Sequence, residues 1–532
     1  MPTHLRRLAY ATAVALTACS SDPRPADQAD AGTDAAMPGH VMTDRGPIIG
    51  HSDGTITAFL GVPYAAPPIG ALRWRAPEAH AAWTAPLDAA TLGPACAQSD
   101  GGIGQTGPYS EDCLTVNVWS PNAAAHAPVM VFLHGGVFVH GSSNQPGYDG
   151  RALAAAGVVA VTLNYRLGVL GFLAHPALTA EDAHHSSGNT GLLDQQAALR
   201  WVHNNIAALG GDPANVTVFG ESAGSMSVCT HLVSPLAAGL FRRAIGESGS
   251  CVRFATPLHS APDGTQPGAE SLGILVAQNL GCDTADDVLA CMRGASVDDV
   301  IAAAPGAEDV VPAGVHLAPN VDGYVLPEPP GQAFAAGRLN ALDGFLAGTN
   351  RDEGTLFTRM KTIDTEADYE AAMAALVPAH TSDLIALYPP ASYPTFVAAY
   401  DAALTDLVFV CQTRAQVRAL AAHGTPTYLY LFTKLTAFGS ATGLGVYHGS
   451  ELPFVFGNLT AVSGMTADDR ALSSQVVGAW TRFAATGDPN AAGAASWPPN
   501  TTASDAYLEI GEPIQAGTGL HASTCDAIEQ WR

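Results

Sequence analysis

Basic residues are scarce in this chain of 532 residues, and lysine occurs only at Lys361 and Lys434. Lysine and arginine together number 23, against 48 aspartates and glutamates, which gives a formal net charge of −25. A surface of this sign repels nucleic-acid phosphates and anionic lipid headgroups. We therefore expect no nucleic-acid partner, and the charge modestly favours neutral or cationic small molecules as substrates.

The sequence also lacks internal repeats and, beyond its N-terminus, any segment that we judge long and apolar enough to span a membrane. It lacks grouped metal ligands as well, because no carboxylate or cysteine follows His184 and His185 at a metal-binding spacing. We predict neither a metal nor a cofactor. Apolar residues make up 47% of the chain, which is enough for a large core.

The N-terminus has the organisation of an export signal. Two arginines precede an apolar segment at residues 8–16, which is too short to cross a bilayer. The segment ends in Leu-Thr-Ala-Cys19, which resembles a bacterial lipobox. We expect residues 1–18 to be a signal peptide and residues 19–40 to be a lipidated Cys19 followed by a disordered tether. The alternative is an ordinary signal peptide with an unmodified cysteine. Both predict an exported protein, either anchored to the cell envelope as a bacterial lipoprotein or secreted.

Strand and helix patterns alternate along the rest of the chain. Apolar or β-branched runs predict strands at 127–133, 158–164, 215–219, 244–247, 345–349 and 428–432. A hairpin is expected over 46–58, and helices are expected at 189–209, 225–233 and 470–486, with helical insertions in 254–340 and 364–423. Such alternation predicts an α/β fold with a mostly parallel central sheet and helices on both faces.

Ser222 lies in a Gly-x-Ser-x-Gly motif between a predicted strand and a predicted helix. A strand that turns directly into a helix must bend sharply, and the flanking glycines let the two arms approach closely. This is the nucleophile elbow of an α/β-hydrolase, which lifts the serine oxygen above the sheet at the helix N-terminus. The motif can also arise by chance in a glycine-rich chain, where Ser222 would only cap a helix.

Several further motifs occur in a consistent order. They lie at Phe59–Arg73, Ser110–Asn117, His134–Phe138, Gly210–Ser225, Asn350–Gly354 and His448–Gly457. Together they resemble the type-B carboxylesterase family, which includes cholinesterases and p-nitrobenzyl esterases, from about residue 46 to about residue 525. The resemblance implies one α/β-hydrolase domain over residues 41–532 and a serine esterase that forms an acyl-enzyme.

The resemblance implies a catalytic triad of Ser222, Glu353 and His448. A serine hydroxyl is a poor nucleophile until a base takes its proton, which a histidine can do near neutral pH. The carboxylate would orient the imidazole and stabilise the imidazolium. The alternatives in the chain are Asp352 for the acid and His423 or His521 for the base.

The resemblance places an oxyanion hole at the backbone N–H groups of Gly136, Val137 and Ala223. Many relatives have a glycine where Val137 stands, so we expect its branched side chain to disfavour esters of bulky tertiary alcohols. Glu221 and Ser248 also match family positions near the triad. They either support catalysis or satisfy buried polar groups.

Export permits disulfide bonds, and the eight cysteines other than Cys19 form an even number. The family pattern pairs Cys96 with Cys113, Cys282 with Cys291, and Cys411 with Cys525. Cys229 and Cys251 match no family pair, so they form a fourth bond or remain buried thiols. The same pattern makes Arg73 and Glu111 a structural ion pair.

The leading interpretation is a hydrolase of a broad range of neutral carboxylic esters, with a small-molecule ester as its partner. The alternatives are a lipase-like acylglycerol hydrolase, a cholinesterase and a non-catalytic adhesion module. The last is disfavoured because all three triad residues are present. A cholinesterase is disfavoured because the loop 97–112, where those enzymes carry a key tryptophan, has Tyr109 as its only aromatic residue. The sequence leaves the natural ester and the oligomeric state open.

Overall fold

The computed structural model of the chain describes residues 39–99, 107–254, 256–263, 266–305, 315–359 and 361–531. All of these residues belong to one compact unit. Cys19 lies outside the described residues, as do the predicted signal peptide and nearly all of the tether. Export and the lipid anchor therefore stay predictions.

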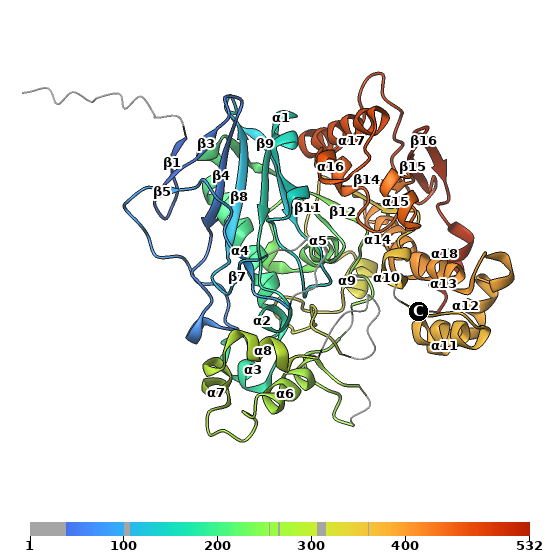
Figure 1. Cartoon of the computed structure of the whole chain (residues 1–532). Coiled ribbons are helices and arrows are strands. Elements are labelled where there is room, and N and C mark those ends of the chain that lie inside the picture. Colours follow the sequence, from blue (N-terminus) through green and yellow to red (C-terminus); the bar gives the residue numbers. More distant parts are fainter. Residues whose placement is uncertain are drawn as a thin grey trace, which may run out of the picture. The chain divides into compact units, whose positions relative to one another are not determined.

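One mixed sheet of eleven strands organises the described part of the chain (Figure 1). In spatial order its strands are β16 (Gln515–Thr518), β15 (Ala506–Ile510), β14 (Thr427–Phe432), β13 (Gly344–Asn350), β12 (Arg243–Glu247), β11 (Gly211–Glu221), β9 (Ala127–Leu133), β10 (Val159–Leu163), β8 (Thr115–Pro121), β4 (Ile56–Pro63) and β3 (His51–Ser52). The pairs from β15 to β10 are parallel. The pairs at both edges are antiparallel, and β3 with β4 forms the predicted hairpin.

Helices cover both faces of this sheet, as expected (Figure 1). One face is covered by α4 (Thr190–Asn205), α5 (Ala223–Val233) and α14 (Cys411–Ala422), and the other by α1 (Arg151–Ala155), α16 (Leu452–Val455) and α17 (Ala467–Thr486). Successive side chains along each strand point to opposite faces of the sheet. Val218 and Ala244 belong to the core with α5, whereas Phe219 and Ile245 belong to the core with α17. Burial on both faces explains why these strands read as continuous apolar runs.

The two predicted insertions are helical. The first contains α6 (Ala269–Asn279), α7 (Val288–Gly294), α8 (Val297–Ala303) and α9 (Pro330–Ala336), and the second contains α11 (Glu366–Leu376), α12 (Thr381–Leu387) and α13 (Phe396–Leu404). Shorter elements complete the described fold: α2 (Gly168–Phe172), α3 (Pro176–Glu181), α10 (Thr355–Thr358), α15 (Ala437–Thr442), α18 (Ala522–Glu529), β1 (His40–Met42), β2 (Pro47–Ile49), β5 (Leu87–Asp88), β6 (Ala95–Cys96) and β7 (Tyr109–Ser110).

One expectation about apolar segments is wrong. The helices α13 and α14 join through a π-helical segment, Thr405–Val410, into one helix over Phe396–Ala422. By length and composition, with a mean hydropathy of 1.2, this helix could cross a membrane. In its most apolar 18-residue window 67% of the residues are buried within the protein, which is typical of a core helix, and α14 packs on β13 and β14.

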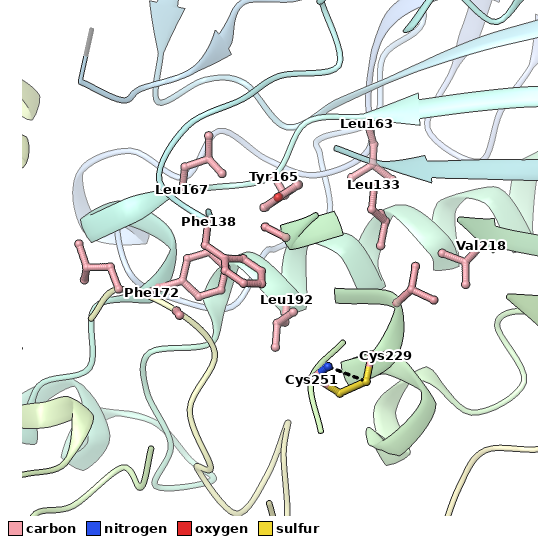
Figure 2. Packing of buried hydrophobic residues seen from close by; sticks show 14 of the residues in the cluster. Leu133, Phe138, Leu163, Tyr165, Leu167, Phe172, Leu192, Val218, Cys229 and Cys251 are labelled. Atoms are coloured by element: carbon pink, nitrogen blue, oxygen red, sulfur yellow. Dashed lines mark hydrogen bonds between the residues drawn. A yellow bond between two sulfur atoms is a disulfide. The ribbon is translucent and has the colours of Figure 1, made fainter. Parts of the chain in front are cut away.

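Four disulfides are present in the described part of the chain, with sequence separations from 9 to 114 residues. Three are those implied by the family pattern: Cys96–Cys113, Cys282–Cys291 and Cys411–Cys525. The fourth, Cys229–Cys251, answers a question that the sequence left open. Figure 2 shows it at the end of a layer of buried side chains, with the hydrogen bond from the Cys251 backbone N–H to the Cys229 sulfur. The predicted Arg73–Glu111 ion pair is also present, with two contacts of 2.7 Å.

The Cys411–Cys525 disulfide should contribute most to stability, because it ties α14 to the C-terminal α18 across 114 residues. In the chain-entropy model such a loop is worth about 4–5 kcal/mol, against about 3 kcal/mol for the nine-residue separation of Cys282–Cys291. We expect the double variant Cys411→Ala/Cys525→Ala to lose more unfolding free energy in urea than Cys282→Ala/Cys291→Ala. Equal losses would contradict this ranking.

Candidate active site

Ser222 stands at the turn between β11 and α5, as the elbow motif predicts. Its φ of 57° and ψ of −124° lie in a region that residues other than glycine rarely adopt. A Cβ atom on Gly224 would lie 1.9 Å from the Leu133 carbonyl oxygen, and one on Gly220 would lie 2.5 Å from the Gly224 carbonyl carbon. Both glycines are therefore required for strand and helix to approach so closely. The Ser222 backbone N–H is anchored on the carbonyl of Glu247, at 2.9 Å.

His448 and Glu353 meet at the same edge of the sheet. The Nδ1 atom of His448 lies 2.6 Å from Glu353 Oε2, and Glu353 is fully buried. The other oxygen of Glu353 accepts the backbone N–H of Asn350 at 2.7 Å, so the carboxylate is held from both sides. A histidine whose Nδ1 is bound in this way presents Nε2 to the opposite side.

The alternative residues for the acid and the base of the triad contact other groups. Asp352 pairs with Arg351 at 2.9 Å and accepts the backbone N–H of Val446 at 2.7 Å. The ring of His521 lies 2.6 Å from Asp406, and the ring of His423 contacts a backbone carbonyl at 3.1 Å. Geometry therefore favours Glu353 and His448 over these alternatives.

Glu221 touches the imidazole directly. Its Oε1 atom lies 3.2 Å from Nε2 of His448, the nitrogen that faces away from Glu353. This Nε2 forms no hydrogen bond with any residue that the structure describes, Ser222 included. Burial lowers the pKa of His448, but Glu221 and Glu353 outweigh burial, so the net pKa is raised above 6.5.

Four carboxyl groups are buried in this region: Glu221 and Glu353 contact the imidazole, and Glu247 and Glu451 interact electrostatically with Glu221. Burial raises the pKa of Glu247 to about 8, although the indole N–H of Trp480 acts in the opposite direction. Burial, together with Glu353, raises the pKa of Glu221 to about 7. Burial and the neighbouring glutamates hold the pKa of Glu451 well above its usual range. Part of this cluster is therefore protonated at neutral pH, because adjacent buried carboxylates cannot all ionise.

The predicted oxyanion loop lies against the elbow. A Cβ atom on Gly135 would lie 2.9 Å from the Ser222 Cβ. Gly136, Val137 and Phe138 follow with φ values of 111°, 51° and 63°. Three successive left-handed residues turn the backbone sharply and can aim consecutive N–H groups at one point, as oxyanion binding requires. Such a φ is costly for a β-branched residue, so Val137 marks backbone strain beside the reaction site.

Ser248 stands beside the elbow at the end of β12. It has a φ of 54° and is fully buried, and its hydroxyl has no hydrogen-bond partner among the described residues. The following Gly249 is tied to the elbow helix, since its carbonyl accepts the Ser225 hydroxyl at 2.6 Å. These contacts do not support the alternative that Ser248 only forms a hydrogen bond with another buried polar group.

Aromatic side chains that the sequence analysis did not identify flank the histidine. The rings of Phe357 and Phe409 lie 5.0 Å and 4.8 Å from that of His448. Phe357 lies in the short helix α10, which begins two residues after Glu353 and which the sequence analysis did not predict. Phe409 belongs to the π-helical segment, which no local sequence pattern predicted. Behind the oxyanion loop, Phe138 packs on Phe172 at 5.0 Å (Figure 2).

The raised pKa of Glu247 predicts how the free energy of unfolding depends on pH. In the folded protein Glu247 keeps its proton up to about pH 8, whereas in the unfolded chain it releases the proton above pH 4.5. The contribution of the protonated carboxyl group to the free energy of unfolding is therefore full below pH 4.5 and is lost as the pH rises to about 8. Glutamine does not titrate and keeps an oxygen for the Trp480 indole N–H. We expect Glu247→Gln to fold and to lose less unfolding free energy than the wild type between about pH 5 and pH 8 in urea titrations.

The matched control is Glu366→Gln, which alters an exposed glutamate in the first turn of α11. It should follow the wild-type pH dependence. If Glu247→Gln follows the same curve as well, Glu247 does not hold a proton in the folded state.

Comparisons with known proteins match nearly the whole chain to one family. The model of the carboxylesterase family matches residues 38–528. The chain is 34% identical over 523 residues to the fumonisin B1 esterase of Sphingopyxis macrogoltabida, covering 93% of this chain and 92% of that protein. It is 37% identical over 476 residues to the para-nitrobenzyl esterase of Bacillus subtilis (strain 168), covering 86% of this chain and 92% of that protein.

Among solved structures, that of a PNB esterase superposes with a TM-score of 0.81 at 33% identity and covers 92% of this chain and 99% of that chain. The family resemblance and the α/β-hydrolase fold expected from the motifs are thereby confirmed. The chain therefore belongs to the carboxylesterase family and is a carboxylic ester hydrolase.

Proposed function

We propose that this hydrolase cleaves neutral carboxylic esters through an acyl-enzyme on Ser222, with His448 as the base and Glu353 as its partner. The observation that carries the proposal is the 2.6 Å contact between His448 Nδ1 and the buried Glu353 at the edge of the sheet where the elbow stands. A buried histidine held in this way, whose Nε2 contacts the residue next to a strained serine, supplies the groups that acyl transfer needs.

In the first half-reaction the Ser222 oxygen attacks the ester carbonyl carbon, and its proton passes to His448 Nε2. The carbonyl oxygen becomes an oxyanion, which the N–H groups of Gly136, Val137 and Ala223 would stabilise. One such donor is worth about 3–4 kcal/mol. The bond to the alcohol oxygen then breaks, and His448 returns the proton to the departing alcohol. Water repeats the sequence on the acyl-enzyme and releases the carboxylic acid.

Glu221 enters this mechanism through its contact with Nε2. When His448 takes the serine proton it becomes a buried cation, and a carboxylate 3.2 Å away favours that state. In the resting enzyme the same carboxyl group competes with Ser222 for Nε2. We infer that Glu221 is a positioning residue and that the Ser222–His448 hydrogen bond forms when an ester enters, as catalytic hydrogen bonds often tighten on binding.

The names of the two relatives guide the choice of substrates. One is called a fumonisin B1 esterase and the other a para-nitrobenzyl esterase. A panel of p-nitrophenyl esters from acetate to palmitate, extended by a para-nitrobenzyl ester and fumonisin B1, would define the range. A jump in rate above the solubility limit of the longer esters would instead favour the lipase alternative.

We expect Ser222→Ala to lower kcat for p-nitrophenyl esters by several orders of magnitude without unfolding the protein, because the triad acts as a unit. A fluorophosphonate probe should label the wild type at Ser222 alone. The neighbours Glu353 and Asp352 provide a matched pair for the acid. Glu353→Gln should lose most of the activity, whereas Asp352→Asn should retain it. Full activity in Ser222→Ala, or the reverse order for the acids, would contradict the mechanism.

Choline esters should not be preferred. Tyr109 lies in the two-residue strand β7, and the loop offers no tryptophan for a cation–π contact, which is worth about 0.5–2 kcal/mol. We expect kcat/KM for butyrylcholine to lie within about tenfold (~1.4 kcal/mol) of that for 3,3-dimethylbutyl butyrate, its neutral isostere. A larger preference at moderate salt would reveal a cation site and favour the cholinesterase alternative.

A further inference from the structure

The long helix Phe396–Ala422 packs against the acid loop, which is the segment of residues 350–358 that carries Glu353. Near its middle this helix contains the π-helical turn Thr405–Val410. Such turns are rare and are frequently found at functional sites, because they change the direction of side chains within a helix. The contacts between this turn and the acid loop indicate what it does here.

The backbone of the acid loop lies directly on this helix. A Cβ atom on Gly354, the residue after Glu353, would lie 2.4 Å from the carbonyl oxygen of Asp401. Only glycine therefore allows the loop to approach the helix so closely. The first residue of the π-helical turn fixes the loop there, because the hydroxyl of Thr405 accepts the Gly354 N–H at 2.9 Å. Both residues are buried, so this hydrogen bond satisfies a backbone N–H that would otherwise lack a partner.

Two further contacts flank that of Thr405 along the helix. Four residues earlier, the carboxylate of Asp401 accepts a hydrogen bond from the hydroxyl of Thr358, the last residue of α10. Four residues later, the ring of Phe409 stacks on that of Phe357, also in α10, with centroids 5.8 Å apart. Side chains four residues apart lie on one face of a helix. A single face of this helix therefore holds the acid loop at three points.

The central contact is the one nearest to Glu353 in the chain. One oxygen of Glu353 accepts the backbone N–H of Asn350, the last residue of β13, and the other contacts His448 Nδ1 at 2.6 Å. The carboxylate is thus anchored from the strand side by Asn350, and the loop that carries it is anchored from the helix side by Thr405. A displacement of about 1 Å between catalytic groups can lower a rate about a hundredfold.

We propose that Thr405 is a positioning residue of the esterase: its hydroxyl fixes the Gly354 N–H and thereby keeps the Glu353 carboxylate on His448. The inference rests on the proposed triad, and Thr405 acts through the backbone of the acid loop rather than on the ester. The alternative is that the hydroxyl only stabilises the fold. Its loss would then reduce the amount of folded enzyme and leave the kinetic constants of the folded enzyme unchanged.

The test compares three variants of the full chain in the hydrolysis of p-nitrophenyl butyrate. Thr405→Val keeps the shape of the side chain and removes the acceptor, whereas Thr405→Ser keeps the hydroxyl. Thr413→Val is the matched control, because Thr413 is a buried threonine of the same helix whose hydroxyl has no hydrogen-bond partner among the described residues. Circular dichroism verifies that each variant is folded, and titration with a fluorophosphonate gives the concentration of active sites.

We expect kcat of Thr405→Val to fall at least about tenfold while KM stays within about twofold of the wild type, because the orientation of the base matters in the transition state more than in substrate binding. Thr405→Ser and Thr413→Val should each retain kcat within about twofold. An unchanged kcat in Thr405→Val, or an equal fall in Thr413→Val, overturns the inference.

The pH dependence of kcat/KM gives a second readout, which a purely structural role would not change. The charged groups that contact the imidazole of His448 are Glu221 and Glu353, and α10 and the long helix present the uncharged rings of Phe357 and Phe409 to it. The two carboxylates outweigh burial and raise the pKa of His448 above 6.5. Hydrolysis requires the neutral imidazole, so activity is lost below that pKa.

A Glu353 that is held less firmly raises the pKa of His448 less. The acid limb of the pH profile of Thr405→Val should therefore move to lower pH by a few tenths of a unit. The acid limbs of Thr405→Ser and Thr413→Val should stay in place. If the acid limb of Thr405→Val also stays in place, Thr405 does not act through Glu353 and the inference is wrong.

Glu353→Gln separates a failure of this inference from a failure of the proposed triad. If Glu353→Gln is fully active, the triad is wrong and Thr405 has no acid to position. If Glu353→Gln loses activity while Thr405→Val keeps full kcat, only the role of Thr405 is refuted. If Thr405→Val does not fold, Thr405→Cys decides, because a thiol is a weak acceptor: kcat should fall severalfold, and an unchanged kcat refutes the role.

Discussion

The structure depends above all on holding several carboxyl groups in a dry interior around one imidazole. Glu221 and Glu353 both contact His448, and Glu247 and Glu451 are buried and interact electrostatically with Glu221. Burial alone would neutralise all of these acids, and a cation alone would ionise them. The balance leaves His448 with a raised pKa and Glu247 with one of about 8. The site can therefore stabilise the positive charge that the imidazole ring gains when it is protonated.

The parallel sheet is what brings these groups together. The carboxyl ends of β11, β12 and β13 lie side by side and deliver Ser222, Ser248 and the loop of Glu353 to one edge. His448 arrives from the loop beyond β14 in the same way. Each polar end is fixed by backbone hydrogen bonds to its neighbour, such as Ser222 N–H to the Glu247 carbonyl. Ligand and catalytic sites of open α/β sheets lie at this edge for the same reason.

A disulfide on one face of the sheet and a packed helix on the other stabilise the elbow. The Cys229–Cys251 disulfide ties α5 to the segment that follows Ser248, and both sulfurs are fully buried. On the opposite face of the sheet, Trp480 of α17 donates its indole N–H to Glu247, which in turn holds the Ser222 backbone. The elbow is thus braced on both faces of the sheet, which is consistent with a backbone conformation as costly as that of Ser222.

The sequence by itself determined the elbow and the alternation of strands and helices and, through the family resemblance, three disulfides and the proposed triad residues. These depend on local patterns, because glycine is needed where backbones approach and burial on both faces produces apolar runs. Only the tertiary structure decided that Glu221 touches His448, that Cys229 pairs with Cys251, and that the apolar helix Phe396–Ala422 belongs to the core. Each of these is a distance between residues far apart in the chain, and the electrostatic energy of a buried charge is set by such distances rather than by neighbours in sequence.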